Sequence, residues 1–458
     1  MTGSDTPRLE RQFPLCAQHV APRCEMVDRS MGKKGRFRAG LLRGSLATVG
    51  GYLVRVNPAL SLFAASLIAF APVHALAQDQ QASVSVRDRP REEYDPLGLR
   101  FGGFTLNATL DLSAASTDNV FAEETGADED VIYAVAPSAR VRSNWSRHAI
   151  QVEAGGRFES HEDFSSEDAD TNFARFYGRL DVGARSTVAL SASTAHEVES
   201  RTEPDAPTGG DPVEYDRQDV ALTAVHTFNR FKLTGGVAQR TFEFDGTQNI
   251  RDNEETSIRA RVDAELTPRI GLVLQAVADE RDYDNHPTPA IVNSEGRTLL
   301  AGVSVNFTDL MRGEINVGQF EREYDAGNSV EGLAVAANLE WYPTGLTTVT
   351  VTGRRNTEDV IGATESQPFT ETEFGARVDH ELLRNLILTA GAQIGRRDYE
   401  SIDREDEVLS ADVGADYLIN RRVALRARYV FDDVQSSGID RYRDFEANAF
   451  TLGLSFRL

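Results

Sequence analysis

Apolar and polar residues alternate along most of the chain from residue 101 onward. In one such segment Leu386, Leu388 and Ala390 lie on one side, and Thr389 and Gly391 lie on the other. Segments of this kind reach about ten residues or more, which is the length that a tilted strand needs to cross a bilayer. The alternation therefore predicts an all-β chain whose strands present one apolar face and one polar face.

Two kinds of connection join these segments and repeat along the chain. Arg-x-aromatic sequences begin at Arg240, Arg281 and Arg322, at intervals of 41 residues, and again at Arg397. Each interval holds two strands, one short turn and one longer acidic loop. The short turns predict nine hairpins and about 18 strands, or about 16 if the first pair is not part of the wall. These turns are expected at residues 143–147, 184–186, 229–230, 267–269, 308–311, 343–345, 382–385 and 419–422.

This asymmetry of the connections predicts a transmembrane, antiparallel, up-and-down β-barrel over residues 101–458. In outer-membrane barrels the short turns face the periplasm and the longer loops face the outside. An even number of strands then places both ends of the barrel segment at the periplasmic side. Aromatic residues near the strand ends are candidate rim or girdle residues at the two membrane interfaces; they are Trp145 and Trp341 near short turns, and Tyr283, Tyr324 and Tyr399 near longer loops.

Composition narrows the class of protein further. The formal charge of −23 over 458 residues argues against nucleic acid as a partner. Both cysteines, Cys16 and Cys24, precede the alternating region, so that region has no disulfide, Cys nucleophile or Cys-based metal site. The histidines are scattered without the spacing of a catalytic or metal-ligand set. We therefore expect no enzymatic activity, no catalytic residue, no bound metal and no cofactor.

The first 77 residues have the order of features of a secretory signal. A basic stretch at 31–55 precedes an apolar run at 59–73, and Ala75 and Ala77 form a cleavage site before Gln78. The apolar run is shorter than the roughly twenty residues of a membrane-spanning helix, which disfavours the alternative of a retained anchor.

The length of this segment and the composition of the next one add two expectations. Signal peptides usually have about 15 to 30 residues, so the true start is expected further downstream, at Met26 or Met31. Residues 78–100 are polar and aperiodic, and are expected to be a disordered periplasmic lead-in.

The last eight residues resemble the C-terminal assembly signal of bacterial outer-membrane β-barrels. The positions that carry this resemblance are Thr451, Gly453, Phe456 and Leu458, with Leu where many such proteins end in Phe. The resemblance implies recognition by the barrel assembly machinery. The final strand is then expected to pair with the first one, near residues 101–112, and to close the wall.

The chain also resembles the putative β-barrel porin 2 family of Gram-negative outer-membrane proteins over about residues 101–458. The residues concerned are Thr117-Asp-Asn-Val-Phe121, the repeated Arg-x-Tyr strand ends, and Gly453, Phe456 and Leu458. The resemblance implies location in the cell outer membrane and porin-like function. Because some relatives are associated with exopolysaccharide export, it also implies polysaccharide export components as partners, besides membrane lipid and lipopolysaccharide.

Two functions follow as hypotheses. The first is a passive or weakly selective diffusion channel, accessory to exopolysaccharide export. The alternative is a non-conducting structural or adhesive barrel whose acidic loops bind cations or surface polysaccharide. The acidic loops, at 123–130, 162–170 and 252–255, are better explained as a solvated surface, because none has the ordered spacing of a calcium motif.

Three further interpretations concern the inside and the rim of the barrel. Arg377, Arg426 and Arg428 lie within strands and are expected to face the lumen, where Asp379 and Asp412 would pair with them. The Arg-x-aromatic sequences are interpreted as structural rim elements, with a sugar-binding path as the alternative. The longest loop, about residues 199–215, is expected to be an ordinary external loop and not an inward constriction.

Overall fold

The computed structural model describes residues 84–203, 206–207, 209–308, 310–361 and 366–458. The predicted cleavage residues Ala75, Ala77 and Gln78 and the alternative starts lie outside the described residues.

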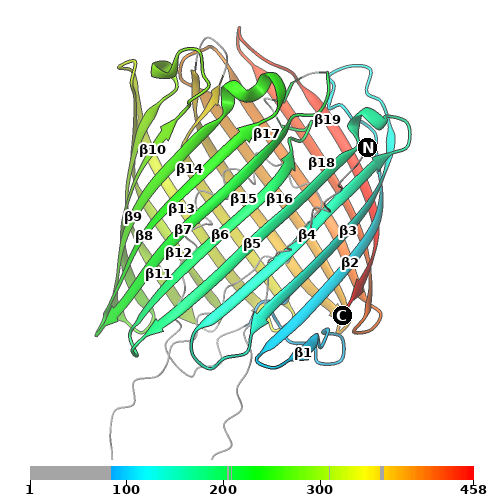
Figure 1. Ribbon diagram of the computed structural model, residues 1–458, viewed down its shortest axis with the longest axis vertical. Coiled ribbons are helices and arrows are strands. Elements are labelled where there is room, and N and C mark those ends of the chain that lie inside the picture. Colours follow the sequence, from blue (N-terminus) through cyan, green and yellow to red (C-terminus); the bar gives the residue numbers. More distant parts are fainter. Residues whose placement is uncertain (1–83, 204–205, 208, 309, 362–365) are drawn as a thin grey trace, which may run out of the picture.

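Eighteen long antiparallel strands form one closed barrel, with the strands inclined to the barrel axis (Figure 1). Each strand pairs with its neighbours in sequence, and the last strand pairs with the first long one, which closes the wall. A short strand, β1 (Leu99–Phe101), pairs with the start of β2 below the wall. The long strands are β2 (Phe104–Thr117), β3 (Asp130–Ser143), β4 (Ala149–His161), β5 (Ala169–Val182), β6 (Ser186–Val198), β7 (Glu214–Phe228), β8 (Phe231–Phe244), β9 (Asn253–Thr267), β10 (Ile270–Asp282), β11 (Ser294–Thr308), β12 (Met311–Tyr324), β13 (Ser329–Thr344), β14 (Thr347–Ile361), β15 (Ser366–Leu383), β16 (Leu386–Tyr399), β17 (Glu405–Leu418), β18 (Val423–Ser437) and β19 (Phe445–Arg457).

The strand number and the turn positions confirm the fold predicted from the alternation. All eight expected short turns join strands of one hairpin at one end of the barrel, which is the lower end in Figure 1. The connection between β7 and β8 consists of Asn229 and Arg230 alone, and Asn229 has a positive φ of 50°. Asn tolerates this left-handed conformation, which a two-residue hairpin loop needs. The wall therefore has 18 strands, and the alternative of 16 is wrong.

The two faces of the wall have opposite character. On β10, Leu272 and Leu274 are exposed on the outer surface, whereas the alternate residues Val273 and Gln275 are buried on the inner side. A barrel in a membrane needs this arrangement, because lipid contacts the outside and polar groups line the inside. Among the described residues, no helix has the length and apolar character that would let it cross a membrane.

The aromatic residues at the strand ends divide into two groups. Trp145 and Trp341, near short turns, are exposed to similar extents at 43% and 45%. The three tyrosines are buried, and the expectation that they belong to a membrane girdle is wrong for Tyr283, Tyr324 and Tyr399. They lie at the ends of strands but on the inner side of the wall.

Local pairing explains the inward orientation of these tyrosines. Residues two apart on a strand point to the same face, and the Arg that precedes each tyrosine faces the lumen. The hydroxyl of Tyr324 donates a hydrogen bond to Asp359, and that of Tyr399 donates to Asp406 at 3.3 Å. A lipid-facing position would leave both acids without these donors.

The outer apolar face gives a direct test of orientation. We expect Leu274→Arg to destabilise the barrel by about 2–4 kcal/mol, because a charge near the bilayer midplane loses its hydration. Urea unfolding in lipid vesicles measures this cost, and Leu274→Val serves as the control that preserves apolar character. Equal midpoints for Leu274→Arg and the wild type would place this face away from lipid.

Candidate functional site

The Arg-x-aromatic repeats place a series of arginines on the inner wall near the end that carries the longer loops. Arg240 donates from Nε to Asp219 at 2.7 Å, and Arg397 donates from Nε to Glu371 at 3.0 Å. Arg322 pairs with Asp279. Each of these arginines is buried and has a carboxylate partner contributed by another strand. The repeated sequence therefore encodes ion pairs along the channel wall.

The most connected part of this wall is centred on Arg281. Its Nη2 lies 2.8 Å from Glu358, its Nη1 lies 2.9 Å from Asp359, and its Nε lies 3.8 Å from Glu255. The two closer acids come from β14, while Arg281 is on β10, so the contact links strands that are not neighbours. Residues 78 positions apart thus share one cluster.

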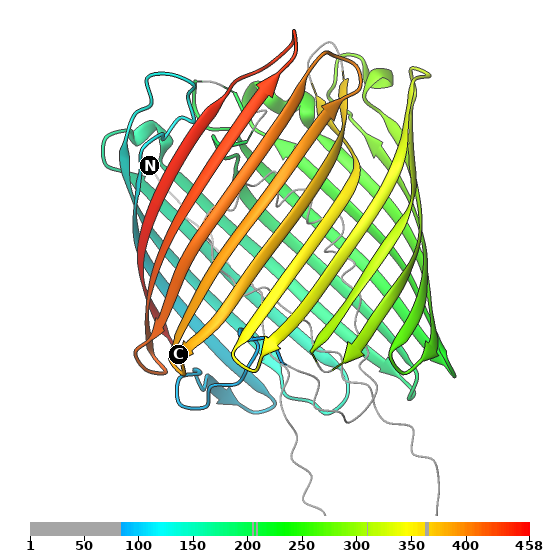
Figure 2. The same ribbon diagram turned by 180° about the vertical axis from the view of Figure 1, so that it is seen from behind.

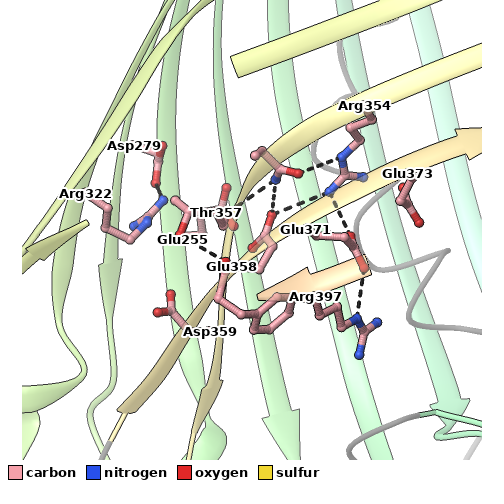
Figure 3. A network of polar contacts seen from close by, with 12 residues as sticks. Glu255, Asp279, Arg322, Arg354, Thr357, Glu358, Asp359, Glu371, Glu373 and Arg397 are labelled. Carbon is pink, nitrogen blue, oxygen red and sulfur yellow. Dashed lines mark hydrogen bonds and ion pairs between the residues drawn. The ribbon is translucent and has the colours of Figure 1, made fainter. Parts of the chain in front are cut away.

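The cluster continues through β14 and β15 (Figure 3). Arg354 Nη2 lies 3.7 Å from Glu358 and 3.8 Å from Glu371, and Glu371 also accepts from Arg397. Figure 3 shows these side chains directed toward one another from several strands. Positive and negative groups therefore alternate along the inner surface, and their charges largely cancel.

The structure places the three arginines expected in the lumen nearer the short-turn end. Arg377 Nε lies 3.3 Å from Asp379, and Arg428 Nη2 lies 3.1 Å from Asp412. Arg426 Nη1 lies 2.9 Å from Asp111 on β2, across the closing strand β19. All three side chains share the inner face with their acidic partners.

The connection between β6 and β7 lies at the long-loop end, and we call its described residues, 199–203, 206–207 and 209–213, the mouth loop. Arg443, in the connection between β18 and β19, donates from Nη2 to the carbonyl oxygens of Arg201 and Glu203, at 2.6 and 3.1 Å. Tyr442 donates to the carbonyl oxygen of Ala206 at 3.0 Å. These contacts join two connections that β2 to β5 separate along the wall.

An ion pair with the connection between β4 and β5 also holds the mouth loop in this position. Arg201 donates two hydrogen bonds to Glu167, from Nε at 2.9 Å and from Nη2 at 2.8 Å, and both side chains are buried. The paired, planar contact fixes direction as well as distance. These contacts are made with other connections at the same end of the barrel, and the expectation of an ordinary external loop stays a prediction.

The opposite end of the barrel carries the segment that precedes β1. Residues 84–98, which we call the N-terminal arm, lie at the lower rim beside the C-terminus (Figure 2). Val86 is fully buried, and its amide donates to the Thr348 hydroxyl at 2.9 Å. Arg91 is also buried. The expectation of a disordered lead-in is thus wrong for this part of residues 78–100, because specific contacts with the wall order it.

The acidic loops make contacts of their own. Glu124 accepts two hydrogen bonds from Arg441, at 2.8 and 2.9 Å, and Asp252 accepts from the amide of Phe244 at 2.6 Å. In the part of the chain that the structure describes, no group of three His, Cys, Asp or Glu side chains is arranged to hold a metal ion.

These features define a class of protein. A closed 18-strand barrel with an apolar outer face, a charged inner face and short turns at one end is an outer-membrane β-barrel of the porin type. The chain belongs to the putative beta-barrel porin 2 family, whose model matches residues 91–458. It is accordingly an outer-membrane protein.

Solved structures of similar proteins include proteins of Pseudomonas aeruginosa and Acinetobacter baumannii. OccK2 (OpdF) of Pseudomonas aeruginosa, in complex with glucuronate, has 12% identity and a TM-score of 0.46, with 78% of this chain and 98% of that chain covered. OpdL of Pseudomonas aeruginosa has 13% identity and a TM-score of 0.41, with 78% and 99% covered. OccAB3 of Acinetobacter baumannii has 12% identity and a TM-score of 0.43, again with 78% and 99% covered. A search of the curated proteins found no match.

Proposed function

We propose that this protein is a passive, weakly selective channel for ions and small hydrophilic solutes across the outer membrane. The observation that carries the proposal is the inner wall of paired charges, in which buried arginines such as Arg240, Arg322 and Arg397 each have a carboxylate partner. A barrel of this size encloses an aqueous lumen unless loops fill it.

The pairing of charges explains why weak selectivity is expected. Rings of like charge make a pore strongly selective for the opposite ion, whereas alternating pairs leave a small net field. Polar solutes would exchange hydrogen bonds with water for hydrogen bonds with the wall at little net cost. Charged rows of this kind suit small solutes that carry hydroxyl, carboxylate or amino groups.

Reconstitution of the purified full chain into planar bilayers tests the proposal. We expect stepwise current increases whose size grows with KCl concentration, as in a water-filled pore. Heat-dependent gel migration verifies that the barrel has inserted. If the inserted barrel conducts no current over a range of salts, the channel is refuted and the non-conducting structural or adhesive barrel is favoured. Export of exopolysaccharide has no support from the comparisons and stays a prediction from resemblance.

The mouth loop gives a second experiment on the channel. Arg443→Ala removes the donors that tie the mouth loop to the β18–β19 connection, and we expect a conductance about twofold larger as the loop moves away from the opening. Arg441→Ala is the matched control on the same connection, because among the described residues Arg441 pairs with Glu124 and Asp444, both at exposed positions. Equal conductance for Arg443→Ala, Arg441→Ala and the wild type would show that the mouth loop does not limit the current.

A further inference from the structure

The N-terminal arm follows the inner rim of the barrel past three consecutive hairpin turns. Arg421, in the β17–β18 turn, donates from Nε to the carbonyl oxygen of Glu92 at 3.0 Å. Arg384, in the β15–β16 turn, donates to that of Pro90 at 3.2 Å. In the β13–β14 turn the carbonyl oxygen of Gly345 accepts a hydrogen bond from the arm. The arm therefore narrows the periplasmic opening along one side.

Inside this rim, Arg87 of the arm occupies an acidic recess of the lumen wall. Its Nε donates to Asp379 at 2.7 Å, its Nη1 donates to Asp416 at 3.2 Å, and its Nη2 donates to the Thr389 hydroxyl. Thr389 in turn donates to Asp379 at 2.7 Å. Both carboxylates are buried, with side-chain exposures of 8% and 9%. The recess thus surrounds a guanidinium group with oxygen acceptors from β15, β16 and β17.

A second acid at the same end, Glu381, also forms ion pairs with arginines of the arm. Glu381 lies 3.2 Å from Arg89 Nη1 and 3.0 Å from Arg91 Nη2. Its side chain has 4% exposure, so the carboxylate has little contact with solvent. Burial lowers the pKa of Arg91, and the charge of Glu381 opposes this shift. The arm supplies cations where the wall supplies acids.

Wall arginines also approach these acids, and Arg384 Nη1 lies 3.4 Å from Glu381. Arg377 approaches Asp379 at 3.3 Å, and Arg426 approaches Asp416 at 3.6 Å while it also pairs with Asp111. Without the arm, the recess would hold three carboxylates, those of Asp379, Asp416 and Asp111, beside the two arginines Arg377 and Arg426. Acidic side chains at a pore mouth favour cations.

We infer that the N-terminal arm is a selectivity element of the channel, in which Arg87 neutralises the recess formed by Asp379, Asp416 and Thr389 and thereby limits cation preference at the periplasmic mouth. The inference rests on the proposed channel function. It assigns the recess as a binding site for a guanidinium group, which the chain itself fills.

Reversal potentials in a KCl gradient test the inference on the full chain in planar bilayers. We expect Arg87→Gln to raise the ratio of K⁺ to Cl⁻ permeability about twofold, because the recess then has uncompensated carboxylates. The double variant Arg87→Gln/Asp379→Asn removes one charge of each sign, and its ratio is expected to return toward that of the wild type. An unchanged ratio in a conducting Arg87→Gln channel would overturn the inference and leave the channel function intact.

A control variant distinguishes the loss of a positive charge in the recess from the loss of a positive charge elsewhere on the protein. Arg297 is on the outer face of β11, where it pairs with Glu295 and both side chains are about 60% exposed, at 59% and 62%. Arg297→Gln removes the same charge from outside the lumen, and we expect no change in the permeability ratio. A change equal to that of Arg87→Gln would mean that overall charge, and not the recess, sets selectivity.

Chemical rescue tests the shape of the recess. Arg87→Ala leaves space for a guanidinium ion among the three acceptors, so guanidinium chloride at low millimolar concentration should lower its K⁺/Cl⁻ ratio toward the wild-type value, while equal NaCl should not. Equal effects of the two salts would overturn the assignment of a guanidinium site. Absence of any conductance in the wild type would instead refute the proposed function on which the inference rests.

Discussion

Deletion of residues 456–458 is expected to leave export across the inner membrane intact and to abolish insertion of the barrel into the outer membrane. Phe456 faces Leu110 in the ladder that closes the wall, and the amide of Leu458 donates to the carbonyl oxygen of Ala108 at 2.9 Å. Without these residues β19 and β2 would expose unpaired backbone groups at a sheet edge. In lipid each such group costs several kcal/mol, so an open wall is not tolerated.

Cell fractionation and heat-dependent gel migration measure this effect. The truncated chain should be found in the periplasm as an unfolded or degraded species, without the fast-migrating folded form of the unboiled sample. Leu458→Phe is the control, because it keeps a terminal apolar residue and the same strand length, and it should insert as the wild type does. Normal insertion of the truncated chain would contradict both the closing role of β19 and the proposed assembly signal.

The parts of the fold that are encoded locally could be predicted from sequence. Strand alternation depends on the two-residue period of extended backbone, and the short turns depend on residues such as Asn229 that accept turn geometry. Closure by the last strand was expected from the alternation of Phe456 and its neighbours and from their resemblance to a C-terminal assembly signal. The structure has the same eight turns and the same closing pair.

The orientation of the rim tyrosines was predictable in principle from the same rule. Arg322 and Tyr324 are two residues apart, so they share a face, and a buried arginine with an acidic partner must face the lumen. The signal was in the sequence, but the preference of tyrosine for membrane interfaces outweighed it. The pairing of Tyr324 with Asp359 shows why the lumen was favoured.

The contacts that connect distant segments could not be predicted from one sequence. Arg281 reaches across the lumen wall to Glu358 on β14, and no local pattern links residues so far apart. The mouth loop and the N-terminal arm are aperiodic, and their positions depend on single anchors such as Arg443 and Arg87. Anchors of this kind can be identified only from the structure, which shows which residues of the wall and of other connections they contact.

The largest effect of a single substitution on stability is expected at Arg281. This arginine joins Glu358 and Asp359 at 2.8 and 2.9 Å, and its side chain has 11% exposure. Arg281→Met would leave both carboxylates, and Glu255 at 3.8 Å, without their shared cation. Removal of one partner from a buried ion pair costs about 3–5 kcal/mol, and water in the lumen should bring the value toward the lower end.

Urea unfolding in vesicles tests this expectation, with Trp145 and Trp341 as fluorescent reporters because both are exposed on the outside. Arg281→Met/Glu358→Gln should recover part of the loss, since one of the uncompensated charges is removed. Arg297→Met, from the exposed pair with Glu295, should change stability by less than about 1 kcal/mol. If Arg281→Met cost no more than Arg297→Met, the cluster would be as hydrated as the outer surface. The ion pairs of the inner wall would then contribute to the field of the channel without holding its strands together.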